Sequence, residues 1–164
     1  MNIYKYILRF VFLVLLQGLL LNNIRLFGYV NPYIYIIFLI TLPCNTSREL
    51  VLLIGFLLGL SVDVFGNTFG IHAFASTFAA FSRYYLLKIF EPRNNYEDIV
   101  PSIQTFGLGA FFKYSLFMVL AHHTVLFVID YFSFAAIIGI LLRILLSSAF
   151  TLGLFMGIEK FKMK

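Results

Sequence analysis

Six apolar runs separated by short polar turns constrain the fold of this chain more than any other feature of its sequence. The runs lie at about residues 4–21, 29–42, 50–65, 69–89, 103–129 and 132–158. A helix that crosses a bilayer needs roughly 20 apolar residues, with a range of about 17–25. Hydrophobic residues make up 62% of the 164 residues and charged residues only 12%, which leaves too little polar surface to cover a soluble globule. The sequence therefore predicts an all-α integral membrane protein with six transmembrane helices in a single domain.

The first apolar run resembles a secretory signal, because Lys5 and Arg9 stand at its start. A signal peptide also needs small residues at a cleavage site. Here the run ends instead at Asn22 and Asn23, with no small-x-small pattern. We therefore expect an uncleaved first span.

Two helix starts can be predicted from capping residues. Proline suits the first turn of a helix, so Pro32 is expected to open the second helix with Asn31 as its cap. Asn67 or Thr68 is expected to cap the fourth helix. The second and third runs are short, which suits a hairpin buried against other helices.

The basic residues predict the orientation in the membrane. With the N-terminus in the cytoplasm, the outer side receives only Arg25. The inner side receives Lys5, Arg9, Arg48, Arg83, Lys88, Arg93, Lys160, Lys162 and Lys164. Because cytoplasmic loops carry an excess of Lys and Arg, we expect both termini to be cytoplasmic.

The stretch from residue 55 to 70 joins an apolar helix to a turn and holds a lone acid. Gly55, Gly59 and Asp63 are four residues apart, so they follow one ridge of a helix. Two glycines in such a ridge allow another helix to approach closely, so we expect Gly55 and Gly59 either to pack against a helix of this chain or to dock a helix of a partner. Asp63 is expected either to contact a partner or substrate at the end of this groove, or to bond the turn at 66–67 or pair with Arg25.

Two further small-residue patterns are present. The fourth run carries Ala73, Ala75, Ser76, Ala79 and Ala80 at steps of three and four, which predicts a close-packing face. In the sixth run, Ala149, Gly153 and Gly157 form a second ridge at steps of four. Both patterns indicate helix–helix contacts.

Lys113 and Arg143 fall inside predicted spans, where ionisable residues usually pair or line a cavity. Each could extend to the lipid headgroups, reach an acid at a helix end, or contact a partner chain. For Arg143 an internal contact with Gln17 or Ser147 is a further possibility.

The sequence offers little for metal binding or catalysis. His122 and His123 are adjacent and point about 100° apart on a helix. A site built with His72, or with Asp63 and His72, has no supporting spacing, so we expect interfacial packing and no metal. The single Cys44 excludes an internal disulfide. Known nucleophile, phosphate-binding and zinc motifs are absent from the sequence, and we expect neither an enzyme nor a cofactor.

The chain resembles the bacterial rod shape-determining MreD family. The resemblance rests on the six short spans, on Asn31-Pro32, and on the glycine-rich stretch with its acid. In the family, a Gly-x-x-x-Gly-x-x-x-Asp segment precedes a turn, a glycine and an alanine-rich helix. The corresponding residues here are Gly55, Gly59, Asp63, Gly70, Ala73 and Ala75.

The resemblance implies a non-enzymatic scaffold of the cell-elongation machinery in the bacterial cytoplasmic membrane, involved in cell shape and peptidoglycan synthesis. It also implies a fold similar to the substrate-binding subunits of energy-coupling-factor transporters. The implied partners are an MreC-type membrane protein and, through it, MreB and the RodA/penicillin-binding protein 2 synthase, with no nucleic acid. The alternative is a substrate-binding subunit of a vitamin-type transporter, with an outward pocket near Asp63, Asn67, His72 and His122.

Overall fold

The protein is described here by a computed structural model that covers residues 3–24, 30–91, 99–131 and 137–162. The described residues are helical or irregular and include no β-strand. Four segments are long and apolar enough to cross a membrane: Ile3–Leu20, Arg48–Gly66, Leu108–Tyr131 and Ile137–Phe161. The all-helical fold and its membrane character are therefore as predicted.

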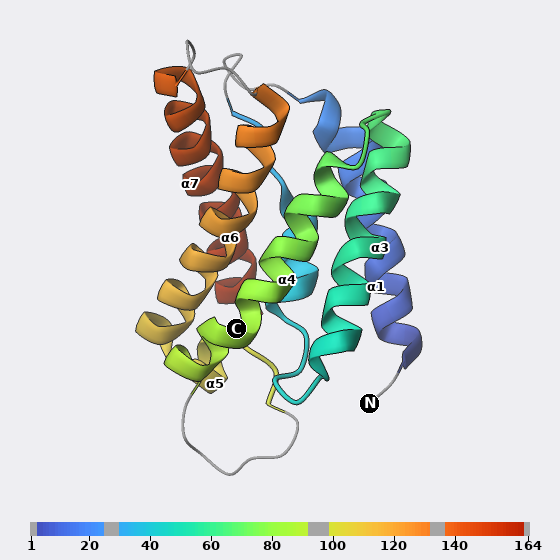
Figure 1. The fold of residues 1–164 in the computed structure, drawn as a ribbon. Coiled ribbons are helices and arrows are strands. Elements are labelled where there is room, and N and C mark those ends of the chain that lie inside the picture. The colour runs from blue at the N-terminus through green and yellow to red at the C-terminus, as the bar shows by residue number, and fades with distance from the viewer. Residues whose placement is uncertain (1–2, 25–29, 92–98, 132–136, 163–164) are drawn as a thin grey trace.

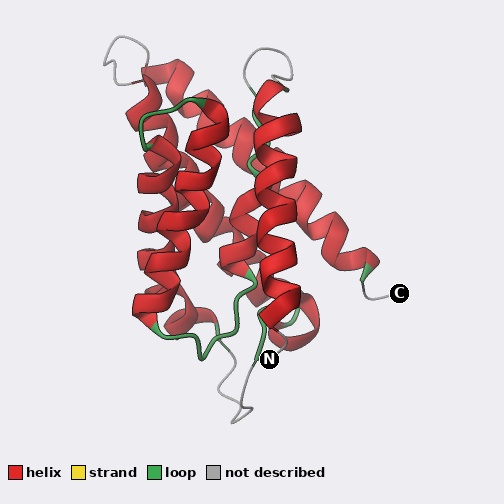
Figure 2. Cartoon of the chain, turned by 90° about the vertical axis from the view of Figure 1, so that its right-hand side faces the viewer, coloured by secondary structure: helices red, strands yellow, loops and turns green. Residues whose placement is uncertain are grey.

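Five long helices form the bundle. They are α1 (Ile3–Leu15), α3 (Arg48–Gly66), α4 (Ile71–Phe90), α6 (Leu108–Tyr131) and α7 (Ile137–Phe161). In Figure 1 they follow one another across the molecule in the order α1, α3, α4, α6 and α7. Figure 2 shows the C-terminal part of α7 running obliquely away from the other helices. Neighbours in the chain are thus neighbours in space, as is usual for helical hairpins.

The end of the first span departs from α-helical geometry. After α1 the chain forms a π-helical turn, η1 (Leu16–Leu20), and a 3₁₀ turn, η2 (Leu21–Asn23). A π-helical turn inserts one residue into the helical repeat and changes the direction of the following side chains. Gln17 lies in this turn and is buried.

The second predicted span is not a membrane-length helix. Only a 3₁₀ turn, η3 (Ile34–Ile36), and one α-helical turn, α2 (Ile37–Ile40), are helical there. The predicted cap is also wrong, because Tyr33 precedes η3 and makes no side-chain cap bond. Residues 35–42 are all buried. An apolar run can be either a helix in lipid or an irregular segment enclosed by helices, and the sequence of the run does not show which. Irregular backbone is tolerated at membrane depth only where other parts of the protein enclose it.

The other helix ends lie close to their predicted positions. Ser47 caps α3 by accepting from the amide of Leu50 at 3.4 Å. The fifth span is divided at Gly107, which has a φ of 75°, into the short α5 (Ile103–Phe106) and α6. A capping box between Ser102 and Thr105 starts α5. Residues 132–136, the predicted start of the sixth span, lie outside the described residues.

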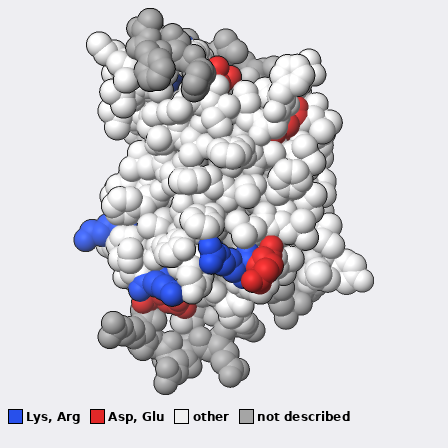
Figure 3. All heavy atoms as spheres, viewed as in Figure 1, with Lys and Arg blue, Asp and Glu red and all other residues white. Residues whose placement is uncertain are grey.

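The two ends of the bundle carry different charges. Figure 1 shows the N-terminus, the turn before α3 and α5 at one end, and the turn between α3 and α4 at the other. The described basic residues at the N-terminal end are Lys5, Arg9, Arg48, Arg83, Lys88, Lys113, Lys160 and Lys162. Figure 3 shows Lys and Arg gathered in the lower half of the viewed face. Arg25, Arg93 and Lys164, also assigned to sides from the sequence, lie outside the described residues.

Candidate functional site

The glycine ridge of α3 is filled by α4 of the same chain. A methyl group on Gly59 would overlap the carbonyl oxygen of His72 and lie 2.5 Å from the Cα of Ala73. A methyl group on Gly55 would lie 2.8 Å from the Cβ of Ala80. The predicted small-residue face of α4 thus packs on this ridge. Of the two roles expected for Gly55 and Gly59, the structure supports packing and leaves no room for an external helix.

Asp63 lies at the end of this ridge and fixes the start of α4. Its side chain is 3% exposed. One carboxylate oxygen accepts from the hydroxyl of Thr68 and from the amide of His72 at 3.1 Å. The other accepts from the amide of Ala73 at 2.8 Å. The first amides of a helix lack partners within it and favour negative charge, so Asp63 caps α4 from the preceding helix.

This arrangement corrects the expected cap of α4. Neither Asn67 nor Thr68 caps it directly. Asn67 ends α3 in the left-handed conformation, with a φ of 51°. Gly70, with a φ of 84°, immediately precedes α4, and its conformation favours glycine. The glycine-rich stretch is therefore a compact α3–turn–α4 element with Asp63 at its centre.

The first half of the irregular segment 30–43, nearest the α3–α4 turn, is held by polar side chains from other helices. Gln17 donates to the carbonyl of Pro32 at 3.1 Å and accepts from the amide of Ile34 at 3.0 Å. On α7, Ser147 accepts from the amide of Asn31 at 3.1 Å, and Thr151 accepts from the amide of Tyr33 at 3.2 Å. These bonds replace those of a regular helix, as backbone at membrane depth requires.

The second half of the segment, residues 37–43, is also held by side chains of other helices. Arg83 is 2% exposed and donates to the carbonyls of Leu42 at 2.5 Å and Pro43 at 3.1 Å. Tyr114 donates to the carbonyl of Ile40 at 3.1 Å. Beside them, burial raises the pKa of the Cys44 thiol to about 12. This thiol is therefore protonated at neutral pH and is a poor nucleophile.

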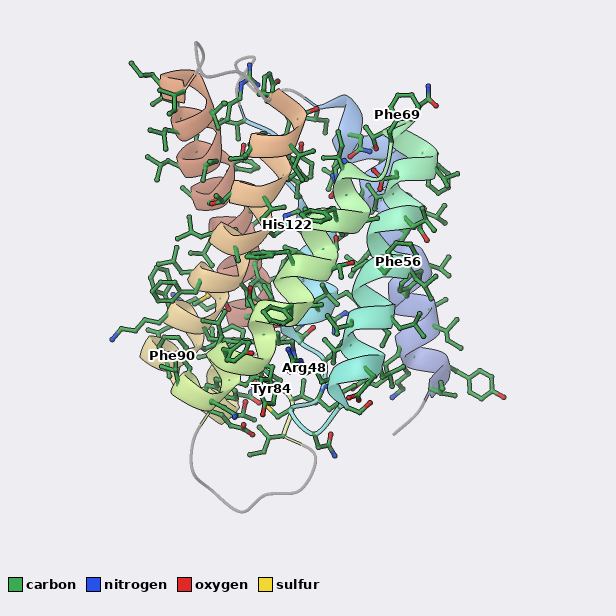
Figure 4. The ribbon with its side chains drawn as sticks, viewed as in Figure 1. Arg48, Phe56, Phe69, Tyr84, Phe90 and His122 are labelled. Carbon is green, nitrogen blue, oxygen red and sulfur yellow. The ribbon has the colours of Figure 1, made fainter. Side chains whose placement is uncertain are left out.

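A buried network of aromatic polar groups occupies the centre of the bundle. The hydroxyl of Tyr35 lies 3.0 Å from Nδ1 of His72 and 2.6 Å from Nε2 of His122. Nδ1 of His123 lies 2.9 Å from the carbonyl oxygen of Val119. Figure 4 places His122 between the helices. All three histidines thus have hydrogen-bond partners. The structure places them in the buried interior of the bundle, not at the interface where packing was expected.

Metal binding gains no support from this network. Among the described residues, no group of three or more His, Cys, Asp or Glu side chains is placed to hold a metal ion. His72 contacts Asp63 through its backbone amide rather than its ring. The two residues therefore do not form the Asp63–His72 site considered from the sequence.

Lys113 and Arg143 lie near opposite ends of the bundle. Lys113 is exposed, in the second turn of α6 from its N-terminal end. Arg143 is half-buried near the start of α7, with its guanidinium carbon 4.5 Å from the centre of the Tyr131 ring. Gln17 and Ser147, considered as partners of Arg143, bond the irregular segment.

The small-residue ridge of α7 remains open. Methyl groups added to Gly153 or Gly157 would meet no atom within 4 Å. Ala149 and Gly153 are exposed. The same row of the helix continues with Leu141 at 53% and Leu145 at 61% exposure. This ridge is therefore an apolar surface that the described chain does not cover.

A small polar pocket lies at the end of the bundle that holds the α3–α4 turn. Its volume is about 140 Å³. Its polar lining residues are Asn22, Asn31, Tyr33, Thr68, His72 and Asp130. Of the four residues expected around an outward substrate pocket, only His72 lines it. Its volume is also below the range of about 300–1,000 Å³ that drug-sized ligands occupy.

Sequence reasoning missed four of these structural residues, namely Tyr35, Arg83, Tyr114 and Thr151. Tyr35 was one of several aromatic residues in an apolar run. Arg83 was used only to assign a side of the membrane, although a base six residues before the end of a predicted span could have suggested a buried contact. Comparisons with protein-family models, with curated proteins and with solved structures found no match to this chain.

Proposed function

We propose that this protein is a non-enzymatic membrane scaffold of the bacterial cell-elongation machinery, which docks an MreC-type partner through α7. The proposal combines the resemblance of the glycine-rich stretch to the MreD family with the open ridge on α7. In this role the protein acts in cell shape and peptidoglycan synthesis, and reaches MreB and the RodA/penicillin-binding protein 2 synthase through its partner.

The proposal places the chain in the cytoplasmic membrane with six passes and both termini inside. Four passes are the long apolar helices α3, α6, α7 and the first span. The other two are α4, whose Arg83 is buried among its neighbours, and the irregular segment 30–43. An enclosed irregular pass is compatible with a bilayer because surrounding side chains satisfy its backbone.

The open ridge of α7 is the observation that carries the docking role. Small residues at steps of four let two helix backbones approach closely in lipid, where packing rather than the hydrophobic effect drives association. The equivalent ridge on α3 is already filled by α4. Ala149, Gly153 and Gly157 are therefore the seat that remains for a partner helix.

Co-purification with an MreC-type protein from native membranes tests this proposal. The variant carries Gly153→Leu and Gly157→Leu, which fill the ridge with side chains. The Cβ atom added at each position lies more than 4 Å from any other residue's atoms outside its own helical turn, so we expect the changes not to disturb this chain. We expect a loss of association of about tenfold or more, equivalent to about 1.4 kcal/mol or more. Thermal stability of the isolated protein is expected not to fall, because leucine is a better helix former than glycine at an open position.

The matched control is Gly109→Leu on α6, because Gly109 is also exposed and open. It adds the same side chain on a different helix. Retained association in the α7 variant, or an equal loss in the control, would remove α7 as the docking surface. Absence of any association of the wild-type protein would remove the scaffold role itself.

The polar pocket at the outer end favours a second candidate, a substrate-binding subunit of a vitamin-type transporter. Its volume of about 140 Å³ is small for a vitamin. Gly18, the one glycine of the first span, is covered by Phe65 at 2.6 Å from an added methyl group, so it provides no open face for a coupling subunit. Thermal stabilisation by a vitamin-like ligand would favour this candidate over the scaffold.

A further inference from the structure

Two basic residues at the base of α3 and α4 are held by a group of aromatic rings. The guanidinium carbon of Arg48 lies 4.8 Å from the ring centre of Phe81 and 5.2 Å from that of Tyr84. The ammonium of Lys88 lies 4.4 Å from the centre of the same Tyr84 ring. Figure 4 shows Arg48 and Tyr84 side by side at this end of the bundle. One ring thus brings two positive charges together.

Within the part of the chain that the structure describes, neither cation makes a close ion pair. Among the described residues, the one ion pair within 4.0 Å joins Lys162 to Glu159. Glu49 follows Arg48 in the first turn of α3, where it favours the helix N-terminus. Glu91 lies against the thiol of Cys44. The attraction of Arg48 and Lys88 for an anion is therefore only partly compensated.

The aromatic rings make this charged patch amphipathic. Phe81, Tyr84 and Tyr85 are 41%, 39% and 47% exposed. Tyrosines with exposed rings and bases with long apolar stems are typical of the membrane interface, where rings meet acyl chains and cations meet headgroups. The patch also lies at the basic end of the bundle, the end proposed above to be cytoplasmic.

We propose that Arg48 and Lys88, which both contact the Tyr84 ring, form a binding site for the phosphate of an anionic phospholipid of the inner leaflet. The two cations contact the phosphate, while Phe81 and Tyr85 contact the start of the acyl chains. The site rests on the proposed membrane orientation and not on docking of a partner. A basic side chain near an anionic surface contributes about fivefold to binding, so the pair contributes about 20- to 30-fold.

Native mass spectrometry of the full-length protein in a zwitterionic detergent tests the site, with phosphatidylglycerol and phosphatidylcholine as probes. We expect one phosphatidylglycerol to bind in preference to phosphatidylcholine. Arg48→Gln combined with Lys88→Gln should weaken that binding about 20- to 30-fold. The matched control, Lys113→Gln with Lys160→Gln, removes two exposed cations elsewhere and should weaken it no more than about twofold.

Three results would overturn the site: no preference for phosphatidylglycerol, equal weakening in both double variants, or equally tight binding of inorganic phosphate. Tyr84→Leu keeps both cations and removes their shared ring, and should weaken binding about threefold if the ring positions them. Thermal stability measured on each variant separates loss of the site from loss of the fold. Because these measurements use the isolated protein, failure of partner docking leaves their outcome unaffected.

Discussion

The ridges on α3 and α7 have nearly the same sequence pattern but opposite surroundings. In α3, Gly55 and Gly59 contact α4 so closely that a single methyl group on either would overlap it. In α7, Gly153 and Gly157 have open space where a side chain would be. A glycine ridge therefore indicates a close helix contact without indicating whether the neighbour belongs to the same chain. The neighbour must be identified from the fold.

The largest expected difference between the ridges concerns Gly59. Gly59→Ala places a methyl group against the backbone of His72 and Ala73, which cannot move without shifting α4. We expect the free energy of unfolding to fall by about 3 kcal/mol or more. Thermal unfolding in detergent measures this effect. A stability equal to wild type would mean that α3 and α4 are further apart than described here.

Asp63 provides the next largest effect, because it anchors α4 on the closed ridge. Asp63→Asn removes the charge and one of the two oxygens that accept from Thr68, His72 and Ala73. Bonds to a charged group contribute about 1.5–3 kcal/mol each, so we expect a loss of about 2–4 kcal/mol. Glu49→Gln, at an exposed acid in the first turn of α3, is the control and should cost less than about 1 kcal/mol. Equal effects in the two variants would show that Asp63 acts only through its charge.

The contrast also shows which parts of the fold the sequence could predict. The length and hydropathy of the apolar runs predicted the four long apolar helices, and the spacing of small residues predicted the packing face of α4. The backbone of residues 31–34 is satisfied instead by Gln17, Ser147 and Thr151, of which the last two lie more than 110 residues away in the chain. Contacts so distant in sequence leave no local pattern. The irregular segment 30–43 was therefore predicted as a helix.

Asp63 illustrates the same limit within a motif. Its place at the end of a glycine ridge predicted a role in the turn, and this was one of the alternatives considered. The partners themselves are the amides of His72 and Ala73 and the hydroxyl of Thr68. They could not be predicted, because their position depends on the sharp reversal after Asn67 and Gly70, whose φ angles are 51° and 84°.

Gly55 sharpens the comparison within the closed ridge. A methyl group there would lie 2.8 Å from the side chain of Ala80 and 3.0 Å from the carbonyl oxygen of Ser76. Gly55→Ala should therefore cost about 1 kcal/mol, since overpacking exceeds the gain in helix propensity by a small amount. Unfolding in detergent beside Gly59→Ala measures the difference. A larger loss at Gly55 than at Gly59 would reverse the expected order of contact.

Gly153 gives the smallest expected effect and one of opposite sign. Alanine is a better helix former than glycine by about 1 kcal/mol. At an open helical position nothing opposes that gain, so Gly153→Ala should raise the free energy of unfolding by about 0.5–1 kcal/mol. The same unfolding measurement on the isolated protein detects it, and Gly157→Ala should behave alike. A decrease would mean that the ridge is already covered in the isolated protein, by a second copy of the chain. In that case both ridges would be closed. The ridge on α3 would be covered by α4 of the same chain, and the ridge on α7 by a helix of the second copy.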